Sequence, residues 1–392
     1  MSPVRSPRYV KLYSRIVTGV GRRLPRPVKN ILKKVWNPWP LRVEIPAVAP
    51  RADAAGPATV DVLCFGIDAP QELADAGHRV FAFETVPSPR MLDGLRRERG
   101  IIAAVSIVQD PAWMPAAEEA RARFGWPIVH EGTRDAIRDA HPKVSIVVVT
   151  YFNRELTRLC LDAVLRTALH PHFEIIVVDN ASTDGTPEML EEYVRRHDNI
   201  RAILNRTNRG FAAANNQGLR AATGDVLVLL NNDTVPARGW LPRMLRHLED
   251  PRTGIVVAVT NFSGNESRIA VPYTTLDGMP AFAEDYARAN EGKSFDIGVA
   301  AMYCVGLRRD AYDKIGPLDE EFTVGMFEDD DYSHRARLAG FRVVCAEDVF
   351  VHHFGQASFG KLPKAEYDAI WRHNQAHYER KWGVTWTPHA GR

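Results

Sequence analysis

The protein has 392 residues, of which 45% are hydrophobic and 25% are charged, and its net charge is +2 at neutral pH. This length is long for one hydrophobic core and predicts two domains. The small net charge predicts no nucleic-acid partner. No apolar run approaches the ~20 residues that span a bilayer.

The N-terminus differs from the rest of the chain in its charge. Residues 1–43 contain eleven Lys and Arg residues and no Asp or Glu, and apolar residues recur there at helical spacing. Such a basic amphipathic segment can lie on an anionic membrane surface; a solvated extension, or one that packs on a partner, is the alternative. Residues 37–58 are rich in Pro and Ala, so we interpret residues 1–58 as an N-terminal extension with a linker.

The four cysteines are widely separated and form no CxxC pair; they are Cys64, Cys160, Cys304 and Cys345. This spacing argues against a metal cluster or a disulfide framework and favours a reducing compartment. The N-terminus also lacks the apolar core of a signal peptide. We therefore expect a cytoplasmic protein, with peripheral contact at the inner face of the plasma membrane as the alternative that the basic N-terminus adds.

Strands alternate with helices between residues 59 and 140. Strands are predicted at residues 59–67, 79–84 and 101–110, and helices at residues 70–78, 91–99 and 116–125. This alternation predicts a small Rossmann-like α/β domain with a parallel sheet. Because no GxGxxG loop follows its first strand, we predict no dinucleotide site there.

The alternation continues in a second domain, which we place at residues 141–383 and which precedes a short tail at residues 384–392. Strands are predicted at residues 144–150, 173–180, 200–205 and 225–230, and helices at residues 154–169, 187–197 and 210–223. The pattern predicts an α/β domain with a mostly parallel sheet.

Each of these four strands ends in polar residues. The ends are Thr150-Tyr151-Phe152-Asn153, Asp179-Asn180, Asn205 with Asn208-Arg209-Gly210 beyond it, and Asn231-Asn232-Asp233-Thr234. The carboxyl ends of parallel strands meet at one edge of a sheet, where ligands bind. One Asp-Asn pair after a strand usually marks only a turn, but four polar ends at one edge predict a nucleotide-sized site.

The residue types at this edge favour a nucleotide diphosphate. Asp179 can accept a hydrogen bond from the imide of uracil or thymine, and Arg209 can meet a phosphate beside the helix N-terminus that follows Gly210. Asp233 is a hard-oxygen ligand for a divalent cation, which would neutralise the diphosphate. The Walker A lysine is absent, which disfavours phosphoryl transfer by a P-loop.

Four segments resemble the successive motifs of family 2 glycosyltransferases. They lie at residues 144–165, 174–190, 208–234 and 327–353, in the order and spacing of that family. The similarity covers about residues 142–382, and the nearest branch is the bacterial one with rhamnosyl- and galactofuranosyl-type transferases. It implies a GT-A (nucleotide-diphospho-sugar transferase) fold with a mostly parallel sheet, preceded here by the small Rossmann-like domain.

The resemblance implies roles for individual residues. Nucleotide binding is expected at Thr150, Tyr151, Asn153, Asp179, Arg209 and Asn232. Asn231-Asn232-Asp233 stands where many relatives have Asp-x-Asp, so Asp233 is the one charged ligand expected for a divalent metal, Mn²⁺ or Mg²⁺. Only one of two adjacent histidines on a strand can face the site, and the resemblance implies that this is His352. An imidazole ligand suits Mn²⁺ better than Mg²⁺.

Four consecutive carboxylates, Glu328 to Asp331, precede a predicted helix. In isolation, an acidic helix start without catalysis is the better interpretation. The family pattern E-D-x-D-hydrophobic instead implies that Asp329 is the catalytic base of a single displacement with inversion. Glu328 is then expected to bind the acceptor, Asp331 to cap the helix, and Asp330 to face solvent.

The resemblance also implies the substrates. We expect a dTDP- or UDP-sugar as donor, and a cell-surface glycan or its lipid-linked precursor as acceptor. Tyr303 is expected near the acceptor, with apolar packing as an equal alternative. Two other functions remain open: a catalytically silent module that binds sugar nucleotide or glycan in an assembly complex, and a nucleotidyltransferase. The latter needs a Gly-rich basic loop after the first strand, which residues 150–156 lack.

Overall fold

The computed structural model describes residues 61–65, 73, 79–83, 87, 89–99, 101–355 and 363–389. Residues 1–60 lie outside the described residues, and with them the whole predicted extension at residues 1–58 and the predicted membrane contact at residues 1–43. No helix in the described ranges combines the length and the apolar character that crossing a membrane requires.

The smaller sheet has four strands among the described residues, in the order β2-β1-β3-β4. They are β1 (Asp61–Phe65), β2 (Arg79–Phe83), β3 (Ala104–Val108) and β4 (Ile128–Val129), with helices α4 (Pro89–Arg99), α5 (Met114–Phe124) and α6 (Arg134–Asp139). All neighbouring strands are parallel. Alternate residues of β1 belong to two different apolar clusters, so both faces of this sheet are buried. The parallel pairing agrees with the predicted alternation.

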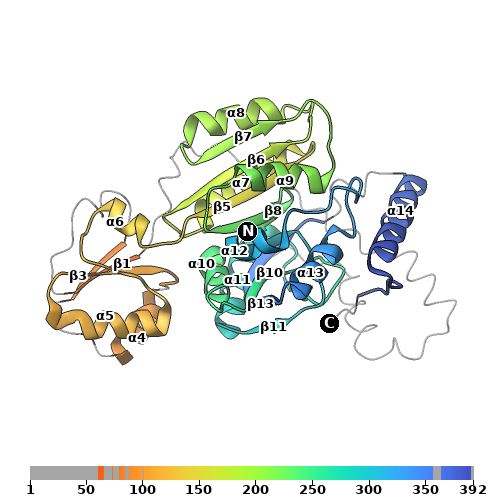
Figure 1. Ribbon diagram of the computed structural model, residues 1–392. Coiled ribbons are helices and arrows are strands. Elements are labelled where there is room, and N and C mark those ends of the chain that lie inside the picture. Colours follow the sequence, from red (N-terminus) through yellow and green to blue (C-terminus); the bar gives the residue numbers. More distant parts are fainter. Residues whose placement is uncertain are drawn as a thin grey trace, which may run out of the picture. The chain divides into compact units, whose positions relative to one another are not determined.

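The larger sheet runs β11-β13-β10-β12-β8-β5-β6-β7, and β9 pairs with β13. Strands β5, β6, β7 and β8 of this sheet are labelled in Figure 1. Its strands are β5 (Val144–Thr150), β6 (Phe173–Asp179), β7 (Ile200–Leu204), β8 (Val226–Asn231), β9 (Thr234–Pro236), β10 (Thr253–Thr260), β11 (Ser294–Asp296), β12 (Cys304–Arg308) and β13 (Arg342–His353). Strands β7, β6, β5 and β8 are parallel. Strand β12 lies antiparallel between β8 and β10. The sheet is therefore mostly parallel, as predicted.

The helices of this part are α7 (Arg154–Thr167), α8 (Thr186–Arg196), α9 (Phe211–Ala221), α10 (Trp240–His247), α11 (Met279–Ala289), α12 (Arg309–Ile315), α13 (Glu328–Leu338) and α14 (Lys364–Trp382). Helix α9 packs on β5 and β6, and α8 on β6 and β7. Strands β5 and β6 are apolar and buried along nearly their whole length because the sheet is covered on both faces.

Strand register brings the polar strand ends together. Thr150 pairs with Asp179 across β5 and β6, and Val149 pairs with Asn231 across β5 and β8. Because these strands are parallel and end at the same level, their following loops meet at one edge.

Candidate functional site

Asp179 ends β6 with one carboxylate oxygen in use and one unpaired. Its Oδ2 accepts a hydrogen bond from the backbone N–H of Ser182 at 3.0 Å. Its Oδ1 is buried and has no hydrogen-bond partner in the described part of the chain. A buried acceptor without a donor is unfavourable, so an imide N–H of a base would satisfy this oxygen.

The turn after β5 presents an aromatic ring. Phe152 and Asn153 have φ of 57° and 61°, in the left-handed region. The turn is held by Ser182, whose Oγ accepts the Phe152 N–H at 2.7 Å. Tyr151 is 37% exposed, and its ring contacts that of Phe152 at 4.4 Å between centroids. The exposed ring of Tyr151 is suited to stack on a nucleobase.

Thr150 and Asn232, both predicted to bind nucleotide, bond within the protein. The Asn232 amide donates to the hydroxyls of Thr150 at 3.1 Å and Thr157 at 2.9 Å. Thr150 is completely buried, and its hydroxyl also bonds that of Thr157 at 2.9 Å. The Thr150 hydroxyl therefore joins the ends of β5 and β8, and nucleotide binding at Thr150 stays a prediction.

Asn180 organises the loop that carries Arg209. Its Oδ1 accepts from the Arg209 backbone N–H at 3.4 Å and from the Asn205 side chain at 3.1 Å, while its Nδ2 donates to the Gly210 carbonyl at 3.1 Å. The Arg209 side chain is exposed. A Cβ on Gly210, which has φ of 80°, would lie 3.3 Å from the backbone nitrogen of Val324. The exposed guanidinium therefore lies on a hydrogen-bonded loop at the N-terminus of α9, where anions are favoured.

Asp233 lies beside His353. The distance from Asp233 Oδ1 to His353 Nε2 is 3.2 Å, and the other ring nitrogen of His353 bonds the Phe262 carbonyl at 3.0 Å. Burial opposes protonation of His353, but the charge and hydrogen bond of Asp233 raise its pKa. The ring is stacked on Tyr303 at 5.3 Å. A histidine whose Nδ1–H is held by a carbonyl has its Nε2 oriented for a metal.

His352 is not the histidine that contacts Asp233, and the metal role that the resemblance implies for it stays a prediction. Its Nδ1 bonds the Tyr273 hydroxyl at 2.7 Å, and burial lowers its pKa to about 4. In the antiparallel pairing of β13 with β9, His352 lies opposite Val235 and His353 opposite Thr234. The two rings therefore point to opposite faces of the strand, and the His353 ring is the one that contacts Asp233.

The residues near Asp233 fit a divalent cation in part. One carboxylate and one imidazole are N/O donors suited to Mn²⁺. Among the described residues, no group of three or more His, Cys, Asp or Glu side chains is arranged to hold a metal. A cation at this site would need further oxygen ligands from a bound molecule.

Tyr303 packs inside the protein, which is the alternative that the sequence left open beside a place at the acceptor. It is buried, and its hydroxyl donates to the Ala258 carbonyl. Its own carbonyl accepts the Asn231 N–H at 2.9 Å. Tyr303 therefore supports the His353 ring and the end of β8 and presents no free hydroxyl to an acceptor.

Glu328 and Asp329 begin α13 in a crowded acidic environment. Asp329 is partly exposed, and its Oδ1 accepts the Asp330 N–H at 3.0 Å. Burial, Asp330 and Glu328 together raise the pKa of Asp329 well above its usual range. Burial and Asp330 raise the pKa of Glu328 to about 7. The Oε2 of Glu328 is buried without a partner in the described part of the chain. Raised carboxyl pKa values are typical of groups that exchange protons near neutral pH.

The structure corrects the predicted roles of Asp330 and Asp331. Asp330 does not face solvent: it is buried, and its Oδ1 accepts from Trp386 Nε1 at 2.9 Å and lies 3.0 Å from His389 Nε2. Asp331 does not cap α13. It is fully buried and bonds three side chains, those of Arg335 at 2.8 Å, Lys381 at 2.7 Å and Trp382 at 3.0 Å. The residue before α13 is Phe327, with φ of 72° and no side-chain cap.

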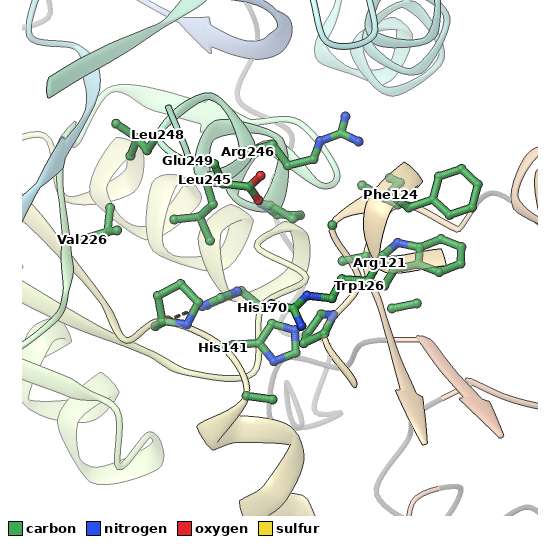
Figure 2. Close-up of a pocket in the computed structure, with 18 of the residues that line it drawn as sticks. Arg121, Phe124, Trp126, His141, His170, Val226, Leu245, Arg246, Leu248 and Glu249 are labelled. Carbon is green, nitrogen blue, oxygen red and sulfur yellow. Dashed lines mark hydrogen bonds between the residues drawn. The ribbon is translucent and has the colours of Figure 1, made fainter. Parts of the chain in front are cut away.

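A cavity of about 590 Å³ lies away from these strand ends (Figure 2). Its lining includes Pro142, just before β5, and Val226, the first residue of β8. His141 and His170 also line it, with their rings edge to face at 5.3 Å. It therefore lies at the N-terminal ends of these strands, opposite the edge where Asp179 and Asp233 lie.

Sequence reasoning missed several residues that shape the site. Ser182 and Asn180 hold the two loops beside Asp179, and His353 contacts Asp233. His389, near the C-terminal end of the described residues, reaches the acidic cluster. The polar end of a strand signalled Asn180 and the pair of adjacent histidines signalled His353, whereas Ser182 and His389 had no sequence signal.

Part of this chain is similar to known proteins. Residues 145–316 match the family model described as Glycosyl transferase family 2. The chain is 28% identical over 228 residues to the glycosyltransferase AglE of Haloferax volcanii, covering 58% of this chain and 71% of that protein. It is 28% identical over 249 residues to the O-antigen biosynthesis protein RfbC of Myxococcus xanthus, covering 58% of this chain but 18% of that protein.

A solved structure is also similar. The mannosyltransferase PcManGT from Pyrobaculum calidifontis, in complex with GDP-Man and Mn²⁺, aligns at 23% identity with a TM-score of 0.45, over 63% of this chain and 66% of that one. Residues 145–316 of this chain match the glycosyltransferase family 2 model, and the mostly parallel sheet with one antiparallel strand beside β8 has the GT-A type of fold.

Proposed function

We propose that this protein is an inverting, metal-dependent glycosyltransferase that moves a sugar from a nucleotide-diphosphate donor to a hydroxyl group. The observation that carries the proposal is the state of Asp329. Of the four consecutive carboxylates, Asp330 and Asp331 are held by C-terminal side chains, whereas Asp329 stays partly exposed with a raised pKa. That is the property required of a general base near neutral pH.

The donor nucleotide would bind at the ends of β5 and β6. The unpaired Oδ1 of Asp179 suits an imide N–H, which favours uracil or thymine and hence a UDP- or dTDP-sugar. Tyr151 would stack on the base, and Asn153 lies in the same turn. Arg209 would meet the diphosphate at the start of α9.

The reaction would be one displacement at the anomeric carbon. The acceptor oxygen forms a bond to that carbon as the bond to the diphosphate oxygen breaks, and the acceptor proton passes to Asp329. Glu328 would orient the acceptor hydroxyl from the same helical turn. Attack from the face opposite the leaving group inverts the configuration, and no covalent intermediate is required.

A divalent metal would be held by Asp233 and His353, together with oxygens of the donor. When bound, such an ion supplies positive charge that stabilises a departing diphosphate. The Nδ1–H of His353 is already directed at the Phe262 carbonyl, which leaves Nε2 available once its proton is lost. The partly filled ligand set, with one carboxylate and one imidazole, favours Mn²⁺ over Mg²⁺.

The proposed acceptor class is based on the name of a similar protein. RfbC, which is similar to this chain, is named for O-antigen biosynthesis. We therefore propose a cell-envelope glycan or its lipid-linked precursor as the acceptor, with a rhamnosyl- or galactofuranosyl-type transfer as the first reaction to examine. The basic residues 1–43 would hold the enzyme at an anionic membrane. Liposome co-sedimentation of the full-length protein and of a variant that begins at Thr59 tests this proposal. Equal binding of both proteins to the liposomes would contradict it.

A donor screen tests the function. The full-length protein is incubated with Mn²⁺ and UDP- or dTDP-sugars, with and without glycan acceptors, and the anomeric configuration of the product is read by NMR. We expect nucleotide-diphosphate release with at least one donor and an inverted product. A retained configuration would contradict the single displacement. Nucleotide binding without turnover on any donor or acceptor would favour a catalytically silent module in an assembly complex.

A further inference from the structure

The loop before Asp329 has an unfavourable backbone conformation. Val324, Met326 and Phe327 have φ of 65°, 82° and 72°. Non-glycine residues rarely adopt this left-handed region and remain there only where the surrounding structure imposes it. Phe327 is followed directly by Glu328 and Asp329 in the first turn of α13. The conformation of this loop therefore determines where that turn begins.

One side chain from α14 bonds the loop at three points. Asn374 Nδ2 lies 3.1 Å from the Thr323 carbonyl, 2.8 Å from that of Gly325 and 3.1 Å from that of Met326. Its two amide hydrogens are thus shared among three backbone acceptors of the strained segment. Asn374 is fully buried, and its Oδ1 has no partner within the described residues. An apolar side chain at this position would leave the three carbonyls without this donor.

Aromatic contacts join the same two elements. The Phe327 ring packs edge-on against Trp371 of α14 at 5.0 Å and against Trp386 at 5.2 Å. The indole N–H of Trp386 continues to Asp330 at 2.9 Å. The C-terminal segment therefore contacts Phe327, which precedes Asp329 in the sequence, and Asp330, which follows it.

The loop also meets the proposed phosphate-binding end of α9. The Val324 carbonyl accepts the Phe211 N–H at 3.1 Å, and the backbone of Val324 lies against Gly210. Residues 323–327 thus connect the helix start beside Arg209 with the helix start that carries Asp329.

We propose that Asn374 is a positioning residue for Asp329, because it holds the loop at residues 323–327 in the conformation from which α13 starts. The inference rests on the proposed function, since it gives Asp329 the role of base. Asn374 does not touch the reacting groups. It acts through the backbone of the loop, and the exposed residue Arg372 on the same helix offers a matched control.

Replacing Asn374 should change the pKa of Asp329, in addition to any effect on the amount of folded protein. The charged groups that face the Asp329 carboxylate are Glu328 and Asp330 from α13, with His389 of the C-terminal segment paired to Asp330. In Asn374→Ala the loop relaxes and water reaches Asp329, so its pKa falls toward the ordinary value. The acid limb of kcat/KM then moves to lower pH. A role in folding alone would leave that limb where it is.

The experiment compares full-length wild type, Asn374→Ala, Asn374→Ser and Arg372→Ala across pH, with kcat expressed per nucleotide-binding site from a titration of UDP or dTDP. We expect at least a tenfold loss of kcat per site and an acid limb at lower pH in Asn374→Ala. Arg372→Ala should match the wild type. Asn374→Ser keeps one hydroxyl donor and should fall between them, and it replaces the alanine variant if that one does not fold.

Two outcomes would overturn the inference, and they differ. Wild-type turnover with an unchanged kcat per site and acid limb in both Asn374 variants refutes the positioning role and leaves the proposed function standing. Absence of turnover by the wild type with every donor refutes the proposed function itself, and the positioning role with it.

Discussion

The contact of His353 with Asp233 gives a sharp prediction. In His353→Ala, Asp233 loses the imidazole 3.2 Å away, and a bound cation loses one of the two protein donors proposed for it. Loss of even an outer-shell partner of a metal ligand typically weakens metal affinity by about 10- to 100-fold, or about 1.4–2.7 kcal/mol, so loss of a direct donor should weaken it by at least that much.

Replacing His352 with alanine should lower the stability of the protein and leave its metal affinity unchanged. His352→Ala removes the 2.7 Å hydrogen-bond partner of the partly buried Tyr273 hydroxyl, and loss of such a hydrogen bond costs roughly 0.5–1.5 kcal/mol. For a domain of about 150–250 residues each kcal/mol lowers Tm by about 2–4 °C. His352→Ala should therefore melt a few degrees lower while its Mn²⁺ affinity is unchanged.

The assay is calorimetric titration of Mn²⁺ in the presence of saturating UDP or dTDP, with thermal melts of the same samples. The reasoning would be refuted if His352→Ala lost Mn²⁺ affinity and His353→Ala retained it. That result would return the metal to the histidine that the family resemblance implied.

The remaining predictions concern the carboxylates. The pKa of Glu328 is about 7 in the folded protein, against an ordinary value of 4.5. Between pH 4.5 and 7, Glu328 stays protonated in the folded protein but ionises in the unfolded chain, so the free energy of unfolding should fall as pH rises through this range. Urea unfolding from pH 4.5 to 7 should show a smaller fall in Glu328→Gln, and an equal fall would contradict the assignment. Asp331→Asn removes a buried carboxylate from Arg335 and Lys381 and should cost roughly 3–5 kcal/mol of unfolding free energy; a change below 1 kcal/mol in denaturant melts would be inconsistent with a buried ion pair. Asp179→Asn should weaken UDP or dTDP binding by about 10- to 100-fold, because a hydrogen bond to a charged acceptor contributes roughly 1.5–3 kcal/mol, and unchanged affinity in fluorescence titration would exclude Asp179 from the base site.

The main strands and the edge that carries the polar residues could be predicted from the sequence. Strands β5, β6 and β8 are short apolar runs that end in polar residues, and their length and flanking residues favour buried parallel strands. The antiparallel insertion of β12 between β8 and β10 could not be predicted, because strand order depends on contacts between segments far apart in the chain.

The differences between prediction and structure in the site have similar causes. His352 and His353 differ only in which face of β13 they occupy, and this depends on register with β9. The acidic residues of α13 gave a local pattern typical of a helix start, but Asp330 and Asp331 are bound by side chains of α14 and the segment after it, about fifty residues away. Thr150 was correctly placed at the strand end, but Asn232 and Thr157 take up its hydroxyl.

The most direct test of the whole account is turnover of Asp329→Asn beside that of Asp330→Asn, with each rate expressed per nucleotide-binding site. The two carboxylates are adjacent, but only Asp329 is proposed to receive the acceptor proton. We expect Asp329→Asn to lose about 10²- to 10⁴-fold in kcat while it still binds nucleotide, and Asp330→Asn to stay within about tenfold of the wild type. Equal activity in Asp329→Asn and the wild type would contradict the central claim.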